Sequence, residues 1–231
     1  MTKWLASIQS LDEAKDLETC LPDILDLKDP SAGALGALAI DDINAIVRWL
    51  DKRCLSSATV GDLMMKSNVI SPVIFQWAET DLDYIKVGLF EDIELENCLV
   101  QLKATLYTAP KPVIAVIFAD QSYPDDIVDL VKQAGFVGVM VDTAEKNGQS
   151  LSSHWSAIDI QRFVKSANDK GLICGLAGAL RIEDIDSLAL TGADYLGFRS
   201  ALCPDRQRIN HLDVSLAIKL EKRLAEFKLA S

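Results

Sequence analysis

The sequence predicts a single-domain (β/α)8 TIM barrel over residues 1–231. Short apolar runs alternate with amphipathic segments along the whole chain, and eight such pairs can be recognised. The apolar runs are continuous, which is typical of parallel strands covered by helices on both faces of the sheet. Their number and the length of 231 residues match the TIM barrel, which has eight strands in about 250 residues.

A doubly wound open sheet is the main alternative, and the sequence disfavours it. The pattern G-x-G-x-x-G, which binds dinucleotides in such sheets, does not follow the first apolar run. Eight strand–helix pairs also exceed what such a sheet usually needs. No stretch of the chain resembles a linker between two domains.

The expected strands are short runs rich in aliphatic residues. They cover residues 4–8, 24–28, 54–61, 82–88, 112–119, 136–141, 171–178 and 194–199. The segments between them have apolar residues three and four positions apart, which predicts helices. These cover residues 11–17, 39–50, 71–78 with a proline near the first turn, 95–106, 124–134, 157–169, 182–190 and 214–227. We expect a long polar loop over residues 143–156, and Asp12 and Glu13 on a solvated helix face.

The composition indicates a soluble cytoplasmic protein. The formal net charge is −11, which repels nucleic acids and anionic membranes, so neither is expected as a partner. An anionic ligand therefore needs a local pocket of lysine and arginine side chains. No apolar run approaches the roughly 20 residues that cross a bilayer, and residues 1–5 do not resemble a secretory signal.

The cysteines and histidines do not point to a cofactor. Five cysteines are scattered through the chain without a C-x-x-C pair, which indicates reduced thiols. The two histidines, His154 and His211, have no further ligands at metal-binding spacing. We therefore expect neither a metal nor an organic cofactor. The sequence leaves open whether copies of the chain form a homo-oligomer.

Two lysines interrupt strands that are otherwise apolar. Lys28 ends the second expected strand, and Lys86 lies between Ile85 and Val87 in the fourth. A single lysine at a strand end can extend to water, but an ammonium group buried in apolar surroundings is costly. Two such lysines in two buried strands predict one shared polar site.

Catalytic residues of a TIM barrel lie at the carboxyl ends of its strands. The polar residues and glycines at these ends are therefore the candidate site residues, namely Lys28, Thr59, Asp62, Lys86, Asp120, Asp142, Gly178 and Arg199. Side chains alternate along a strand, so Asp26 points the same way as Lys28, and Tyr84 the same way as Lys86. Asp120 could orient a water molecule or a lysine, or cap the helix that follows.

Clustered lysines point to Schiff-base catalysis. An isolated lysine, with a pKa of about 10.4, is protonated at neutral pH and does not attack a carbonyl group. Burial and repulsion among Lys28, Lys86 and Lys146 would lower the pKa of a lysine toward the range in which an imine forms. Asp26 and Asp142 would limit this repulsion and could carry protons.

Glycines at the last two strands suggest a phosphate site. Gly178 ends the seventh strand, and residues 197–200, which include Arg199 and Ser200, end the eighth. TIM barrels commonly bind phosphate there through backbone N–H groups, and Arg199 could add charge-assisted hydrogen bonds. Close packing at a barrel corner explains either motif alone equally well. Together with the lysines, the two motifs favour phosphate binding.

Six motifs, in order, resemble the (5-formylfuran-3-yl)methyl phosphate synthases, which act in methanofuran biosynthesis. They are DLKDP (residues 26–30), GALG (33–36), SATVGD (57–62), YIKVGL (84–89), DTAEKNG (142–148) and LAG (176–178). The resemblance implies a TIM barrel that condenses two molecules of glyceraldehyde 3-phosphate into a phosphorylated furan aldehyde, with release of phosphate and water. It also implies that Lys28 forms the Schiff base, that Lys86 accepts protons, and that Asp142 and Lys146 belong to the active site.

The sequence departs from this family at a few positions. Asp29 stands where archaeal members have asparagine, and Gln149 stands where a lysine often occurs. Ser200 replaces a glycine in the loop after the eighth strand, which weakens the inference of phosphate contacts there. Two other functions stay open. A class I phosphosugar aldolase would use the same lysines without forming a ring, and a non-catalytic phosphometabolite-binding barrel would need only the phosphate contacts.

Overall fold

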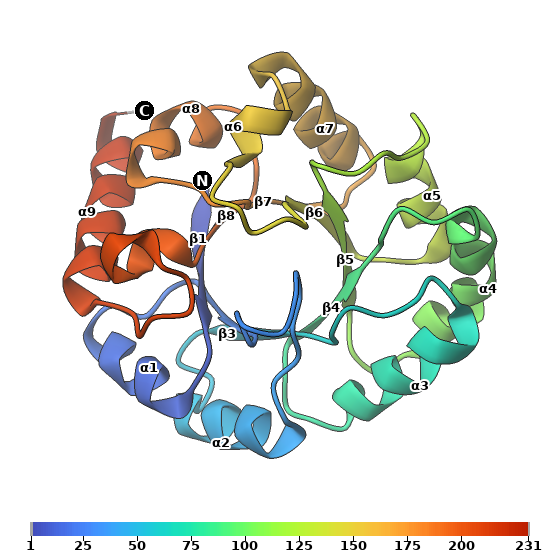
Figure 1. Ribbon diagram of the computed structural model, residues 1–231, viewed down its shortest axis with the longest axis horizontal. Coiled ribbons are helices and arrows are strands. Elements are labelled where there is room, and N and C mark those ends of the chain that lie inside the picture. The colour runs from blue at the N-terminus through green and yellow to red at the C-terminus, as the bar shows by residue number, and fades with distance from the viewer. Residues whose placement is uncertain (1, 231) are drawn as a thin grey trace.

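The computed structural model describes residues 2–230, and within them eight parallel strands form a closed barrel (Figure 1). The strands are β1 (Lys3–Ile8), β2 (Ile24–Leu27), β3 (Leu55–Thr59), β4 (Tyr84–Gly88), β5 (Val113–Phe118), β6 (Gly138–Asp142), β7 (Ile173–Leu176) and β8 (Tyr195–Phe198). Each strand pairs in parallel with the next, and β8 pairs with β1 to close the sheet. The predicted TIM barrel is confirmed.

Helices form a ring around the barrel (Figure 1). They are α1 (Leu11–Asp16), α2 (Ile40–Leu50), α3 (Ser67–Ala78), α4 (Leu95–Thr108), α5 (Ile127–Ala134), α6 (Leu151–His154), α7 (Ala157–Asp169), α8 (Ile185–Ala189) and α9 (Val214–Ala230). Short 3-10 helices are η1 (Leu17–Thr19), η2 (Ile182–Asp184), η3 (Ser200–Leu202) and η4 (Pro204–Arg206). Across residues 2–230, every helix is too short or too polar to cross a membrane.

Helix α3 begins earlier than predicted, at Ser67 rather than at residue 71. The N–H groups of Val69 and Ile70 donate to the carbonyl of Lys66, at 2.9 and 3.0 Å, and so build the first turn ahead of Pro72. A proline removes one backbone donor and is disfavoured inside a helix. Here the helix continues through Pro72, because Ile70, Ile74 and Trp77 of its inner face are buried against the barrel.

The segment predicted as a long polar loop contains a short helix, α6. Its start is stabilised by a capping box, in which Ser150 and Ser153 exchange hydrogen bonds between side chain and backbone. Leu151 is completely buried and attaches the segment to the core. The polar composition concealed this helix, since its four residues are too few to show a helical period.

The barrel wall is buried on both faces, which explains why its strands are apolar throughout. Residues that point inward, among them Leu5, Ile114 and Met140, form a core inside the barrel. A Cβ atom at Gly197 would lie 2.7 Å from the Cε atom of Met140, and one at Gly175 would lie 3.0 Å from its Cγ atom. These two glycines therefore leave the space that Met140 fills beneath the carboxyl ends of the strands.

Candidate active site

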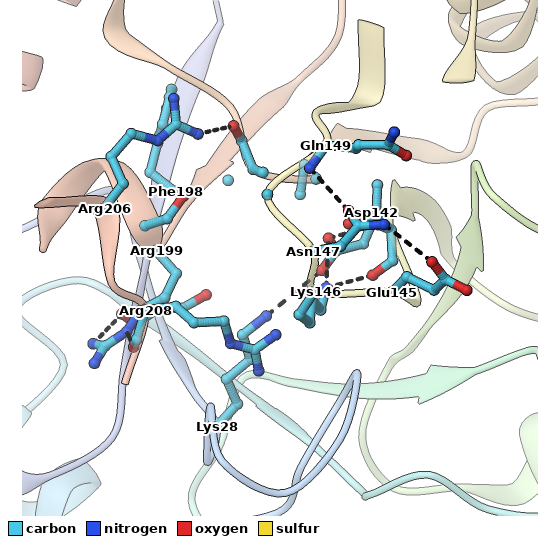
Figure 2. Close-up of a pocket in the computed structure, with 18 of the residues that line it drawn as sticks. Lys28, Asp142, Glu145, Lys146, Asn147, Gln149, Phe198, Arg199, Arg206 and Arg208 are labelled. Atoms are coloured by element: carbon cyan, nitrogen blue, oxygen red, sulfur yellow. Dashed lines mark hydrogen bonds and ion pairs between the residues drawn. The ribbon is translucent and has the colours of Figure 1, made fainter. Parts of the chain in front are cut away.

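A cavity of about 440 Å³ opens at the carboxyl ends of the strands (Figure 2). Lys28, Lys86, Asp142 and Lys146 all line it, although Lys86 and Asp142 come from β4 and β6 and the other two follow β2 and β6. The structure thus brings together the four residues that the sequence and the family resemblance nominate for catalysis. This position is the one at which TIM barrels carry out their chemistry.

Lys86 and Asp26 form a buried ion pair, with 3.1 Å between Nζ and Oδ2. Asp26 also accepts hydrogen bonds from the hydroxyl groups of Ser7, at 3.0 Å, and Ser57, at 2.5 Å. Burial alone would raise the pKa of this carboxyl group, but Lys86, Lys28 and Ser57 outweigh burial and lower it. Asp26 is therefore a fixed anion, held by Ser7 of β1 and Ser57 of β3, and it is outside the set of residues that line the cavity.

The side chain of Lys28 is only 6% exposed, and its Nζ atom lies 3.6 Å from Oδ2 of Asp142. Burial lowers the pKa of Lys28 to about 8. Asp142 and Asp26 oppose this shift, whereas the positive charges of Lys146 and Lys86 add to it. A lysine with this pKa is neutral in roughly one molecule in ten at pH 7, which makes it a competent nucleophile.

Asp142 lies between two lysines, as Figure 2 shows. Besides the contact with Lys28, its Oδ1 atom is 3.1 Å from Nζ of Lys146 and accepts a hydrogen bond of 2.7 Å from the backbone of Thr143. Lys146 also donates to the carbonyl of Thr143. Burial raises the pKa of Asp142, but Lys146, Lys28 and the Thr143 N–H together bring it well below its usual range. Asp142 is thus an anion that both lysines share.

The loop after β2 is fixed by residues at the end of β3. Asp62 accepts hydrogen bonds from the N–H groups of Ala34 and Leu35, both at 2.8 Å. Thr59, a candidate site residue from the sequence, donates to the carbonyl of Gly36 at 2.9 Å and is completely buried. Its hydroxyl group therefore holds the loop that follows Lys28, and Thr59 is outside the set of residues that line the cavity.

Asp120, another candidate site residue at a strand end, supports the loop after β6 in the same way. Its two carboxylate oxygens accept hydrogen bonds from the N–H groups of Ala144 and Glu145, both at 2.7 Å. These residues belong to the segment that carries Lys146. The side chain of Asp120 is thus committed to the loop after β6, and it too is outside the cavity lining.

Arg199 lines the cavity, but its guanidinium group is directed at the barrel seam. It forms a two-point ion pair with Glu13 and donates to the carbonyl groups of Ser7, Arg208 and Asn210. Glu13 is 0% exposed, so the interpretation of Glu13 as part of a solvated helix face is wrong. A buried carboxylate needs a cation beside it, and Arg199 supplies that cation.

Gly178 and Ser200 lie in the wall of the cavity, as expected from the sequence. Gly178 has φ +101, a left-handed conformation that favours glycine, and an added Cβ atom would lie 3.0 Å from Cγ2 of Thr143. The hydroxyl group of Ser200 is buried and has no hydrogen-bond partner within the described residues.

Four polar residues at the site escaped the sequence analysis as candidates. Ser7 and Ser57 hold Asp26, while Arg206 and Arg208 line the cavity from the loop that follows β8. The serines could have been found from alternation, since each pairs with Asp26 in the sheet register. No pattern in the sequence pointed to the arginines, which lie beyond the end of the eighth expected strand.

Comparison with known proteins gives a consistent result. The sequence profile of the family described as 4-HFC-P synthase matches residues 4–221. A protein of Methylorubrum extorquens, to which the name (5-formylfuran-3-yl)methyl phosphate synthase is provisionally attached, is 38% identical over 211 residues, or 90% of this chain and 86% of the relative. The (5-formylfuran-3-yl)methyl phosphate synthase of Archaeoglobus fulgidus is 33% identical over 231 residues, or 94% of this chain and 97% of the relative.

Solved structures show the same architecture in more distant proteins. The phosphoribosyl anthranilate isomerase of Thermus thermophilus superposes on 98% of this chain and 99% of its own, with a TM-score of 0.68 and 14% sequence identity. At that identity the similarity shows the barrel fold alone.

Proposed function

From the premise that this chain belongs to the 4-HFC-P synthase family, we propose that it makes (5-formylfuran-3-yl)methyl phosphate for methanofuran biosynthesis. The substrates are two molecules of glyceraldehyde 3-phosphate, and the other products are phosphate and water. The observation that carries the proposal is Lys28, a buried amine whose pKa falls to about 8, directed into a cavity between two ion-paired carboxylates.

The first step is imine formation at Lys28. Its neutral Nζ attacks the carbonyl carbon of a triose phosphate, after aldose–ketose isomerisation, and water leaves with the former carbonyl oxygen. The imine withdraws electrons from the adjacent carbon, so that a base can remove a proton there and leave an enamine. The cavity supports this step because the ion pair between Lys28 and Asp142 is long, at 3.6 Å, so that Nζ of Lys28 can turn toward a ligand.

Lys86 then moves protons, and Asp142 and Lys146 share that task. Lys86 lines the same cavity as Lys28 and is anchored by Asp26, whose Oδ2 atom lies 3.1 Å from Nζ of Lys86. Each correctly placed acid or base contributes roughly 10²–10⁴ in rate. Asp142 contacts both Lys28 and Lys146, so a proton can pass between these amines through one carboxylate.

The remaining steps form the ring. The enamine attacks the second triose, which creates the new carbon–carbon bond. Elimination of one phosphate as an anion, closure through a hydroxyl oxygen and a net loss of two water molecules then give the furan. Cleavage of the bond to Lys28 releases the product and restores the free amine. The aromatic ring is far more stable than its precursors and draws the sequence of steps forward.

Borohydride trapping tests the proposal. The protein is incubated with glyceraldehyde 3-phosphate and borohydride, its intact mass is measured, and the adduct is located by peptide mapping. We expect one reduced triose phosphate on Lys28, and furan formation, followed by its ultraviolet absorption, in the sample without borohydride. Lys28→Met should lose both signals, while Lys52→Met, a change at an exposed lysine outside the cavity, should keep them.

Other outcomes separate the alternatives. An adduct on Lys28 with a non-aromatic product would indicate a class I aldolase. Loss of neither signal in Lys28→Met would remove Lys28 as the nucleophile. Absence of both adduct and product in the wild-type protein would favour a phosphometabolite-binding barrel.

A further inference from the structure

The cations of the cavity fall into two groups. Lys28 and Lys146 share the carboxylate of Asp142, Lys86 pairs with Asp26, and Arg199 pairs with Glu13. Arg206 and Arg208 form no ion pair with any carboxylate of residues 2–230, and both bind backbone carbonyl groups instead. The positive charge that remains for an anionic ligand is therefore concentrated on these two arginines.

The guanidinium group of Arg208 uses some of its hydrogen-bond donors and leaves another without a partner among residues 2–230. Its Nη2 atom donates to the carbonyl groups of Pro30, at 2.6 Å, and Gly33, at 3.0 Å, which ties the loop after β8 to the loop after β2. Its Nε atom is buried without a hydrogen-bond partner in the described part of the chain. The guanidinium group is thus fixed in place while some of its donors stay unused.

The guanidinium group of Arg206 is likewise held by a backbone carbonyl group. Its Nη2 atom donates to the carbonyl of Ala179, the residue after Gly178, at 2.5 Å. The backbone around it is strained, since Asp205 and Arg206 have φ 52 and φ 57, a left-handed conformation that costs free energy in residues other than glycine. Figure 2 shows Arg206 and Arg208 on the side of the cavity across from Glu145, Lys146 and Gln149, with Arg208 directed toward Lys28 and Arg206 directed away from it.

We propose that Arg206 and Arg208 form an anion subsite that binds the phosphate group of a triose phosphate substrate. The inference rests on the proposed function for the identity of that substrate. A guanidinium group presents parallel N–H donors that match the oxygens of phosphate, and its charge strengthens the hydrogen bonds. The buried hydroxyl group of Ser200 and the backbone of Gly178 lie in the same wall and can complete the subsite.

Two further observations support the subsite. Partial burial lowers the pKa of both arginines, and the carboxylates around them, among them Asp184 for Arg206 and Asp142 for Arg208, only partly offset this shift. A bound phosphate would supply the missing negative charge. The net charge of −11 also repels anions from the molecule as a whole, so a phosphorylated substrate needs such a local concentration of cations. The phosphate role expected of Arg199 passes to these residues, because Arg199 is engaged with Glu13.

The test compares two aldehydes at the same lysine. Glyceraldehyde 3-phosphate and unphosphorylated glyceraldehyde are each trapped on Lys28 with borohydride, and the half-saturating concentration is measured. Arg206→Gln and Arg208→Gln should raise this concentration for the phosphorylated aldehyde roughly tenfold to a hundredfold, the loss of one charged hydrogen-bonding group. They should change it less than about twofold for glyceraldehyde. Arg162→Gln, at an exposed arginine of α7, is the matched control.

A general disturbance of the site would raise the half-saturating concentration of both aldehydes equally, and this result would overturn the inference. An unchanged concentration for both aldehydes would overturn it as well. Binding of inorganic phosphate, measured by calorimetry, gives a readout that needs no chemistry. It should weaken in both arginine variants and not in Arg162→Gln. The arginine variants could instead bind inorganic phosphate more weakly while their half-saturating concentration of glyceraldehyde 3-phosphate is unchanged. The subsite would then bind the released phosphate and not the substrate, and the inference would be overturned.

The proposed function and the anion subsite would be contradicted by different results. If the wild-type protein gives neither an adduct nor the furan, the proposed function is wrong. Calorimetry with inorganic phosphate still decides whether Arg206 and Arg208 bind an anion. If trapping on Lys28 succeeds and the arginine variants behave as wild type, the proposed function stands and the subsite does not.

Discussion

Arg199 and Glu13 form a buried two-point ion pair that joins the last strand of the barrel to the first helix. The distances are 2.6 Å from Nη1 to Oε2 and 3.1 Å from Nη2 to Oε1, and neither residue is more than 8% exposed. Arg199 also donates to the carbonyl of Ser7 near the end of β1. The pair therefore closes the seam between β8 and β1 beside the cavity.

Removing one member of this pair should destabilise the fold. Glu13→Gln leaves the Arg199 guanidinium buried without its anion, and we expect a loss of about 3–5 kcal/mol in the free energy of unfolding. Urea denaturation measures this loss. Glu18→Gln breaks the exposed pair between Glu18 and Arg53 and should cost less than about 1 kcal/mol. Equal midpoints for the two variants would show that the seam pair adds nothing to stability.

The rate of borohydride trapping should follow the titration of Lys28. Burial lowers the pKa of Lys28 to about 8, and only the neutral amine attacks a carbonyl group. As the pH rises from 6, the neutral fraction increases roughly tenfold per pH unit, and it levels off above about pH 8. Initial trapping rates at low substrate concentration measure this profile. A rate that keeps rising to pH 10 would mean that Lys28 behaves as an ordinary exposed lysine.

The two neighbours of Lys28 should shift this pH profile in opposite directions. Asp142 raises the pKa of Lys28, so Asp142→Asn should move the midpoint of the trapping profile to lower pH. Lys146 lowers the pKa of Lys28, so Lys146→Met should move the midpoint to higher pH. Charge-preserving Asp142→Glu and Lys146→Arg are the controls. Shifts of the same sign in both variants would contradict the charge arrangement around Lys28.

Much of the barrel and the centre of the site could be predicted from the sequence, because both depend on local pattern. Continuous apolar runs identify strands buried on two faces, and polar residues at their ends mark the cavity. Alternation predicts that Asp26 points the same way as Lys28, and the structure pairs Asp26 with Lys86.

The remaining roles depend on contacts between residues far apart in the chain. Arg199 and Glu13 are 186 positions apart, and a pattern in either segment says nothing about the other. Thr59 and Asp120 have the sequence context of ligand-binding residues, yet each hydrogen-bonds to a neighbouring loop. The position of a residue at a strand end therefore predicts that it contributes to the site. It does not show whether the residue contacts the ligand or supports a loop.

Gly33 is the position where loop support should be most sensitive to change. It has φ +90, and an added Cβ atom would lie 2.1 Å from Oδ2 of Asp62, the carboxylate that holds Ala34 and Leu35. Its carbonyl also accepts a hydrogen bond from Arg208. Gly33→Ala must therefore displace Asp62 as well as strain the backbone, and the loop that follows Lys28 should loosen.

Gly171→Ala is a matched control for Gly33→Ala. Gly171 also has a positive φ, of +62, but an added Cβ atom would have no heavy atom within 4 Å among the described residues. Both variants share a backbone cost of about 1 kcal/mol, so any difference between them reflects the contact with Asp62. We expect Gly33→Ala to unfold at lower urea concentration than Gly171→Ala and to trap glyceraldehyde 3-phosphate more slowly at saturation. Equal behaviour of the two variants would show that the Asp62 side chain can move away at no cost in free energy. The loop after β2 would then not need this glycine to position Lys28.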